Sequence, residues 1–268
     1  MGKRSAPMGM VHELYESFWL KEVQRNDEQY DSDAYWLVAY LAAFQKGDFS
    51  KKADFVELFT KSGDREVLCV GMRIFMAVCS HDDFELLMDF FENPDDYDDF
   101  RAFLVSVTES LSYQSIPYLL ALHDLWADTV IAAEIAFILN GMLHFAPPDG
   151  LLEGKYGEYT TEQIGEAFLA FGESHDLNGY YYDGKEVFLG DFTKQLMGDA
   201  IYCRGNNEPF YSAEIPSILS NSTGIECPVK PDDEIDEEKI GAILDYIDRL
   251  PKEKFQRNCK YFYGHLIQ

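Results

Sequence analysis

The segment 95–99 is the first candidate for chemistry, because it places four carboxylates around one aromatic ring. Asp95, Asp96, Asp98 and Asp99 flank Tyr97. Carboxylate oxygens are the ligands of hard divalent cations, so one interpretation is a cation site. A second is a solvated turn between two helices. A third is a contact patch for a basic partner, since a positive charge would relieve the repulsion among the like charges.

The segment 180–183 is the second candidate. It reads Tyr180, Tyr181, Tyr182 and Asp183. Tyrosine is enriched in interface hot spots because it buries a large rigid ring and keeps one polar group. The alternative is that two rings cover the core and one is exposed. Together with the acidic segment, these four residues are our predicted partner-binding residues.

The familiar catalytic and metal-binding motifs are incomplete. A zinc-protease-like pattern begins at His12 but lacks the second histidine four residues on. A calcium-loop pattern near Asp176 has Tyr181 and Val187 where glycine and glutamate are needed. The phosphate-binding and dinucleotide-binding glycine patterns and the Gly-x-Ser-x-Gly pattern do not occur. We therefore predict a protein without metal or cofactor that is not an enzyme.

The elements around these segments repeat at a spacing of about 32 residues. Three short apolar patches stand in register: Phe55, Val56, Leu58 and Phe59; Leu87, Met88, Phe90 and Phe91; Leu119, Leu120 and Leu122. A second set of helical patterns lies between them: 36–44, 67–78, 100–111 and 131–142. One helix pair cannot bury its apolar face alone, so neighbouring pairs must stack. Such a period is typical of an α-solenoid.

The apolar periodicity and the capping residues also predict where the elements lie. We expect helices over 11–24, 33–45, 50–61, 66–79, 84–92, 100–111, 129–143, 164–171, 188–203 and 234–250, and another that starts near 115–117. A loop or short hairpin is expected over 178–185, closed by Asp-Gly. The segment 204–231 should be mostly irregular, and the aromatic ending at 261–265 should be docked.

The predicted fold is therefore mainly α. Residues 1–150 form a HEAT-like α-solenoid of antiparallel helix pairs, and the breaker Pro-Pro-Asp-Gly at 147–150 ends it. Residues 151–268 form a more irregular, mostly helical C-terminal cap. We expect this cap to pack on the repeats as one unit.

Charge narrows the class of partner. The net charge is −26, from 48 acidic and 22 basic residues spread along the chain. Such a field repels nucleic acid and anionic membrane surfaces. It attracts basic partners and raises their association rate, although solubility alone would also explain it. We therefore predict a protein partner, with no nucleic acid and no membrane bound.

The cysteines and the N-terminal residues suggest a compartment. The five cysteines are odd in number and form no Cys-x-x-Cys pair, which favours a reducing environment. The first residues lack the apolar core of a secretory signal. No stretch approaches the roughly 20 apolar residues of a membrane span. We expect a cytoplasmic protein.

Two segments carry a family resemblance. The stretch 219–229, Leu-Ser-Asn-Ser-Thr-Gly-Ile-Glu-Cys-Pro-Val, and the Tyr-Phe-Tyr-Gly-His ending at 261–265 resemble motifs of bacterial toxin-immunity proteins. The helix pairs are similar to HEAT-like repeats, with Asp-Arg-Glu-Val at 64–67 nearest to their signature. The resemblance implies a cytosolic antitoxin of a contact-dependent or other polymorphic toxin system. Such proteins bind one cognate toxin domain, often a nuclease, and block it without chemistry.

Three functions remain open from the sequence. The leading hypothesis is an inhibitory binding protein for a basic toxin domain. The alternative is a general HEAT-like adaptor or scaffold with several partners. The third is an enzyme, since some DNA glycosylases are HEAT-like. Those enzymes need a basic concave face, whereas residues 101–150 contain only Arg101 as a lysine or arginine.

Overall fold

The computed structural model describes residues 33–92, 97–127, 129–143 and 160–268. Helices dominate these ranges, and the strands described there are four pieces of two residues each. The prediction of a mainly α fold is confirmed. The helix expected over 11–24 lies outside the described residues. No helix within the described ranges has the length and hydropathy to cross a membrane.

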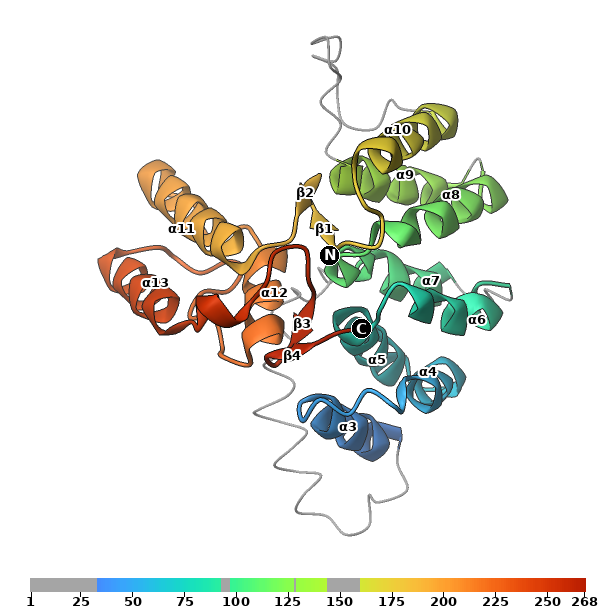
Figure 1. The fold of residues 1–268 in the computed structure, drawn as a ribbon, viewed down its shortest axis with the longest axis horizontal. Coiled ribbons are helices and arrows are strands. Elements are labelled where there is room, and N and C mark those ends of the chain that lie inside the picture. Colours follow the sequence, from blue (N-terminus) through green and yellow to red (C-terminus); the bar gives the residue numbers. More distant parts are fainter. Residues whose placement is uncertain (1–32, 93–96, 128, 144–159) are drawn as a thin grey trace, which may run out of the picture.

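The first helices that the structure describes stack on one another in chain order (Figure 1). Their α-helices are α3 (Asp33–Phe44), α4 (Lys52–Lys61), α5 (Arg65–Val78), α6 (Met88–Glu92), α7 (Tyr97–Leu104), α8 (Ile116–Leu125), α9 (Val130–Leu143) and α10 (Thr161–Ser174). Three 3-10 helices connect them: η3 (Asp82–Leu87), η4 (Val107–Ser110) and η5 (Tyr113–Ser115).

Contacts in this stack recur between alternate elements. Helix α3 packs on α5, α5 on α7, and α7 on α9, while α4 packs on η3 and α8 on α10. Two layers of stacked helices give such a pattern. Helix α10 lies with this stack although it follows residue 150, and it contacts α8 and α9. The HEAT-like character of the repeats and the division at residue 150 stay predictions, because the break at 147–150 lies outside the described residues.

Two of the expected helices are shorter than the sequence pattern suggested. The first part of the segment 84–92, up to Leu87, belongs to the 3-10 helix η3, so the α-helix α6 begins only at Met88. At the start of η3 the Asp83 carboxylate accepts hydrogen bonds from the Ser80 amide and hydroxyl. The helix expected over 100–111 ends at Leu104. The Ser106 hydroxyl donates to the carbonyl of Ala102 and so competes with the helical ladder. Apolar spacing alone did not reveal these side-chain bonds.

The C-terminal part gathers on the other side of the molecule, with two hairpins between it and the stack (Figure 1). Its elements are β1 (Tyr181–Tyr182), β2 (Lys185–Glu186), α11 (Leu189–Asn206), α12 (Glu214–Thr223), α13 (Glu237–Arg249), η6 (Lys252–Lys254), β3 (Tyr261–Phe262) and β4 (His265–Leu266). The hairpin expected over 178–185 is confirmed as β1–β2. Asp183 and Gly184 both have positive φ, which is the turn that Asp-Gly favours.

Helix α12 corrects the expectation that 204–231 is mostly irregular. Pro216 is the third residue of this helix, where a backbone N–H has no helical partner to lose. Gly224 ends the helix with a φ of +72°. Pro216 therefore marks the start of a helix here. The many small residues of this segment led us to expect irregular structure instead.

The core has one large apolar cluster in the helix stack and a second among α11, α12 and α13. The expected docking of the C-terminal residues is confirmed, because Phe262 and Ile267 are buried in the first cluster. Strand β3 contacts both α5 and α12. The end of the chain thus joins the two parts.

Gly71 allows α5 to approach α4 closely. A Cβ at this position would overlap the side chain of Phe59. Gly71→Ala should therefore lower the free energy of unfolding by about 1–2 kcal/mol, even though alanine favours a helix. Urea unfolding measures this change. Gly165→Ala in α10 is the matched control, because its Cβ would meet nothing within 4 Å. Equal stability of both variants would contradict close packing at Gly71.

Candidate partner-binding site

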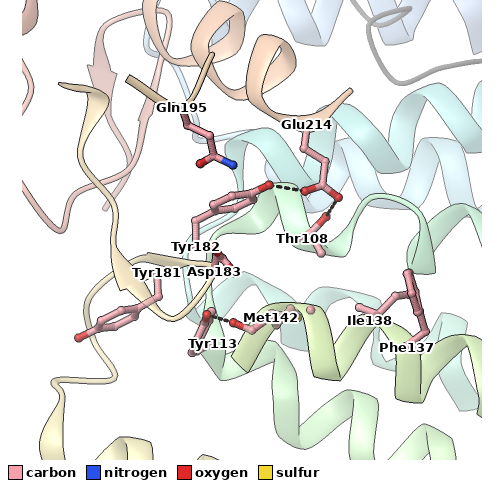
Figure 2. Close-up of a pocket in the computed structure, with 11 residues that line it drawn as sticks. Thr108, Tyr113, Phe137, Ile138, Met142, Tyr181, Tyr182, Asp183, Gln195 and Glu214 are labelled. Atoms are coloured by element: carbon pink, nitrogen blue, oxygen red, sulfur yellow. Dashed lines mark hydrogen bonds between the residues drawn. The ribbon is translucent and has the colours of Figure 1, made fainter. Parts of the chain in front are cut away.

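A pocket of about 320 Å³ lies between the helix stack and the C-terminal part (Figure 2). One wall comes from the stack and the other from the β1–β2 hairpin and the starts of α11 and α12. The lining residues are Thr108, Tyr113, Phe137, Ile138, Gly141, Met142, Tyr181, Tyr182, Asp183, Gln195 and Glu214.

The β1–β2 hairpin is anchored to the stack by backbone groups. The Tyr181 amide donates to the Leu111 carbonyl at 2.8 Å. The hydroxyl of Tyr113 donates to the Met142 carbonyl and accepts from the Gly184 amide, 2.7 Å away. These bonds tie the start of β1 to Leu111, which directly follows η4, and the turn of the hairpin to Tyr113 of η5. The hairpin residues that line the pocket are therefore held in place by hydrogen bonds to the stack.

Glu214 is the charged group at the centre of the pocket wall. It occupies the first turn of α12, where the helix dipole favours a carboxylate. The Tyr182 hydroxyl donates to its Oε2 at 2.6 Å, and the Thr108 hydroxyl donates to its Oε1 at 3.2 Å (Figure 2). Burial, and then the charge of Glu214, raise the pKa of Tyr182. Tyr182 therefore remains a protonated donor.

The pocket is negative. Its lining includes the carboxylates of Asp183 and Glu214 and no lysine, arginine or histidine. Lys185 comes within 3.9 Å of Asp183, but the lysine side chain is 78% exposed and such surface pairs are weak. Asp199, one turn beyond Gln195 on α11, adds a third carboxylate to the surroundings of Tyr182.

Exposed apolar side chains occur on both α9 and α11, the helices that contribute Phe137 and Gln195 to the pocket. On α9, Phe137 is 62% exposed, and Val130, two turns earlier on the same face, is 70% exposed. Tyr202 of α11 and the nearby Tyr211 are also exposed, with their rings 6.4 Å apart. Exposed apolar side chains on the surface of a protein are typical of a site that binds another protein when they gather into a patch.

A comparison with protein families identifies the group to which this chain is related. The family model described as Immunity protein 47 matches residues 22–267. The chain belongs to the immunity protein 47 family. The resemblance to toxin-immunity proteins seen at 219–229 and 261–265 is thereby confirmed. No curated protein and no solved structure matches the chain. Membership in this family supports a toxin-neutralising role through binding to a cognate toxin protein.

In this immunity protein the four predicted residues at 180–183 divide into two groups. Tyr180 is 6% exposed and stacks on His81 with ring centroids 4.3 Å apart. Tyr181 is 1% exposed and packs on Tyr113. Tyr182 and Asp183 are half-buried and line the pocket. A partner would thus reach mainly the second pair, and the partner-binding role of all four stays a prediction.

The predicted acidic segment is only partly described. Asp95 and Asp96 lie outside the described residues. Tyr97, Asp98 and Asp99 form the first turn of α7, and their side chains also lie outside the description. Among the side chains that are described, no group of three His, Cys, Asp or Glu is placed to hold a metal ion. The contact role of the acidic segment stays a prediction.

Sequence reasoning missed the other pocket residues of this immunity protein. Glu214 fell in a segment expected to be irregular, although an acidic residue two positions before Pro216 is a helix-start signal. Phe137 belongs to the most apolar expected helix, whose apolar residues exceed what one buried face can hold. That surplus was the available signal for an exposed apolar face on α9.

Proposed function

We propose that this immunity protein neutralises a basic, nuclease-type toxin domain by binding it at the pocket between α9 and α11, without chemistry of its own. It would act in the cytoplasm, as part of a contact-dependent or other polymorphic toxin system. The observation that carries this proposal is a negative pocket whose lining includes the exposed ring of Phe137. Family membership supports toxin neutralisation, and the pocket supports the basic character of the toxin.

The two features of the surface have different physical roles. A net charge of −26 accelerates the encounter with a basic partner over a distance set by the salt concentration. The exposed rings of Phe137, Tyr202 and Tyr211 can bury apolar area and slow dissociation. A nuclease needs a basic cleft for phosphate groups, so an acidic surface can compete for that cleft.

A growth-rescue assay tests the proposal. The C-terminal domain of the protein encoded immediately upstream would be induced in cells with and without this chain. We expect the domain to stop growth and this chain to restore it, while an unrelated acidic protein does not. Toxicity that this chain fails to relieve would contradict immunity. Binding of several unrelated proteins with similar affinity would favour an adaptor.

Salt should act mainly on the association rate of the complex. Between 50 mM and 500 mM NaCl we expect the association rate constant to fall at least about 10-fold, because the attraction is screened. The dissociation rate constant should change much less, since it depends on buried contacts. Surface plasmon resonance with the purified toxin domain measures both. An association rate independent of salt would contradict steering by charge.

The acidic segment has its own test. Reversing Asp95, Asp96, Asp98 and Asp99 to lysine should slow association about 10-fold at low salt if the segment faces the toxin. The circular dichroism spectrum and the unfolding midpoint should stay close to those of the wild type. A matched control reverses four exposed acids that do not line the pocket, Glu234, Glu238, Asp245 and Asp248 of the α13 region. Equal slowing by both variants would show a general charge effect and remove the segment from the interface.

A further inference from the structure

We infer that the pocket receives the side chain of one arginine of the toxin, with its guanidinium group on the carboxylate of Glu214. This inference rests on the proposed function and names the chemical group that the pocket recognises. The occupant is thus an arginine of a protein partner, and the contact centres on the wall formed by Tyr182, Thr108 and Glu214.

The size of the pocket fits a single side chain. Its volume of about 320 Å³ is near the lower end of the roughly 300–1,000 Å³ found for small-molecule sites. A helix or a strand of the partner would not enter such a space. A side chain that projects from the partner's surface would, while the exposed rings of α9 and the α11 side contact the surface around it.

The charge of Glu214 has no structural counterpart among the described residues. No lysine or arginine in the described ranges forms an ion pair with it. Both of its hydrogen bonds come from hydroxyl groups. A neutral glutamine could still bond to both, because its carbonyl oxygen can accept from one hydroxyl and its amide N–H can donate to the other. Its negative charge also acts unfavourably on the buried Glu109 nearby. The fold therefore gains little from this charge, whereas a bound cation would use it.

The number of acceptor sites favours arginine over lysine. A carboxylate offers about four acceptor sites, two on each oxygen. Tyr182 uses one on Oε2 and Thr108 uses one on Oε1, so each oxygen keeps one site. Two parallel N–H groups of a guanidinium need one acceptor on each oxygen. The ammonium of lysine is a point charge and gains no such match.

The other lining residues also suit a guanidinium group. Of the aromatic side chains that line the pocket, Phe137 is exposed and Tyr182 is half-buried, whereas Tyr113 and Tyr181 are buried. Arginine stacks on aromatic faces more readily than lysine does, because its group is planar and weakly hydrated. Asp183 supplies a second negative charge to the lining. The combination of an oriented carboxylate with aromatic walls is the chemistry that selects arginine.

The first experiment uses small probes on the full chain. Blocked arginine (N-acetyl-arginine methylamide) is titrated into protein labelled at isoleucine and methionine methyl groups, and NMR shifts are followed. We expect saturable shifts at Ile138 and Met142, which line the pocket, and binding at least about 10-fold weaker for blocked lysine. Blocked citrulline, the neutral analogue of the same shape, should cause none. Shifts of equal size with citrulline, or shifts confined to methyl groups elsewhere, would overturn the inference.

The second experiment uses the cognate toxin domain. Glu214→Gln removes the charge and one acceptor oxygen, while its amide can still bond to both hydroxyls by accepting from one and donating to the other. We therefore expect its affinity for the toxin to fall at least about 10-fold, because the charge-assisted bidentate contact is lost. Glu186→Gln on β2 is the matched control, because this exposed carboxylate belongs to the same hairpin and does not line the pocket. It should bind as the wild type does. Replacing one arginine of the toxin with lysine should reproduce the loss caused by Glu214→Gln.

The outcomes separate the two proposals. If the wild type binds the toxin and Glu214→Gln binds it equally well, the inference about arginine is wrong and the proposed function stands. If the wild type does not bind the toxin, the proposed function is wrong, and the arginine contact with the toxin is wrong with it. Similar unfolding midpoints of Glu214→Gln and the wild type ensure that a loss of affinity is not a loss of fold.

Discussion

Replacing Lys260 with methionine should lower the free energy of unfolding by about 3 kcal/mol. The Lys260 side chain is buried, and its ammonium group donates to the carbonyls of Met76 and Cys79 at 2.6 and 2.8 Å. These carbonyls lie at the C-terminal end of α5, where a helix has no further N–H groups to offer. Methionine fills a similar space but leaves both acceptors without this donor.

The magnitude follows from two opposing effects. Each buried acceptor that loses its partner costs about 1–3 kcal/mol. Removing a buried charge offsets part of this loss, and burial already lowers the pKa of Lys260. Because Lys260 directly precedes β3, the last hairpin should also loosen from α5, and its amide hydrogens should exchange faster.

Urea unfolding of the wild type and two variants measures the effect. Lys254→Met is the matched control, because Lys254 is exposed in η6 of the same C-terminal segment. It should change stability by less than about 0.5 kcal/mol. An unchanged midpoint for Lys260→Met would mean that the ammonium group does not hold the two parts together.

The helix stack could be predicted because its signal is repeated. Apolar residues at a helical spacing recur about every 32 residues, and each recurrence supports the others. The same signal does not specify how a helix ends. Ser106 and Asp83 shorten two helices through side-chain hydrogen bonds, and Leu111 adopts a φ of +57° that no apolar pattern encodes. Boundaries were therefore less predictable than the elements themselves.

The hairpin at β1–β2 could be predicted from two residues, since Asp183-Gly184 favours the tight turn that forms. What could not be predicted was the environment of the hairpin. Tyr182 meets Glu214 across 32 positions, and Glu214 meets Thr108 across 106 positions. These are contacts between separate parts of the chain, and no local spacing indicates them. The pocket is a product of packing, which explains why only Tyr181, Tyr182 and Asp183 of its lining residues were predicted.

The burial of the tyrosines follows from the same packing. Tyrosine suits both an interface and a protein core, because both can use a large ring with one polar group. Only the neighbours decide between them. Phe171 and Tyr113 enclose Tyr181, whereas Tyr182 turns towards Glu214 and the pocket. Three consecutive tyrosines thus have different environments although their sequence context is nearly the same.

Glu109 should make stability fall as the pH rises, and replacing it with glutamine should remove this effect. Glu109 belongs to η4 and is buried against α12, where the hydroxyl of Ser217 donates to its Oε2 at 3.0 Å. Burial is the largest cause that raises the pKa of Glu109 from 4.5 to about 7, the charge of Glu214 raises it further, and Arg73 and Lys260 oppose the rise. At neutral pH this carboxyl is therefore close to its titration midpoint.

The sign follows from the protons bound in each state. Between pH 4.5 and 7 the folded protein keeps a proton that the unfolded chain has lost, so the folded state is favoured less as the pH rises. The full difference corresponds to about 3 kcal/mol above pH 7. His81 acts in the opposite direction, because burial lowers its pKa and its contribution is lost as the pH falls. This contribution is the same in wild type and variant and cancels in their difference.

Urea unfolding at pH 5, 6, 7 and 8 measures the difference between Glu109→Gln and the wild type. We expect the variant to gain about 2.5 kcal/mol relative to the wild type from pH 5 to pH 8, because glutamine carries no charge to bury. Glu186→Gln, an exposed carboxylate on β2, is the control and should show a difference that does not change with pH. A constant difference for Glu109→Gln as well would mean that Glu109 keeps an ordinary pKa. A difference that grows with pH would show that ionisation of Glu109 destabilises the folded protein at the contact between η4 and α12.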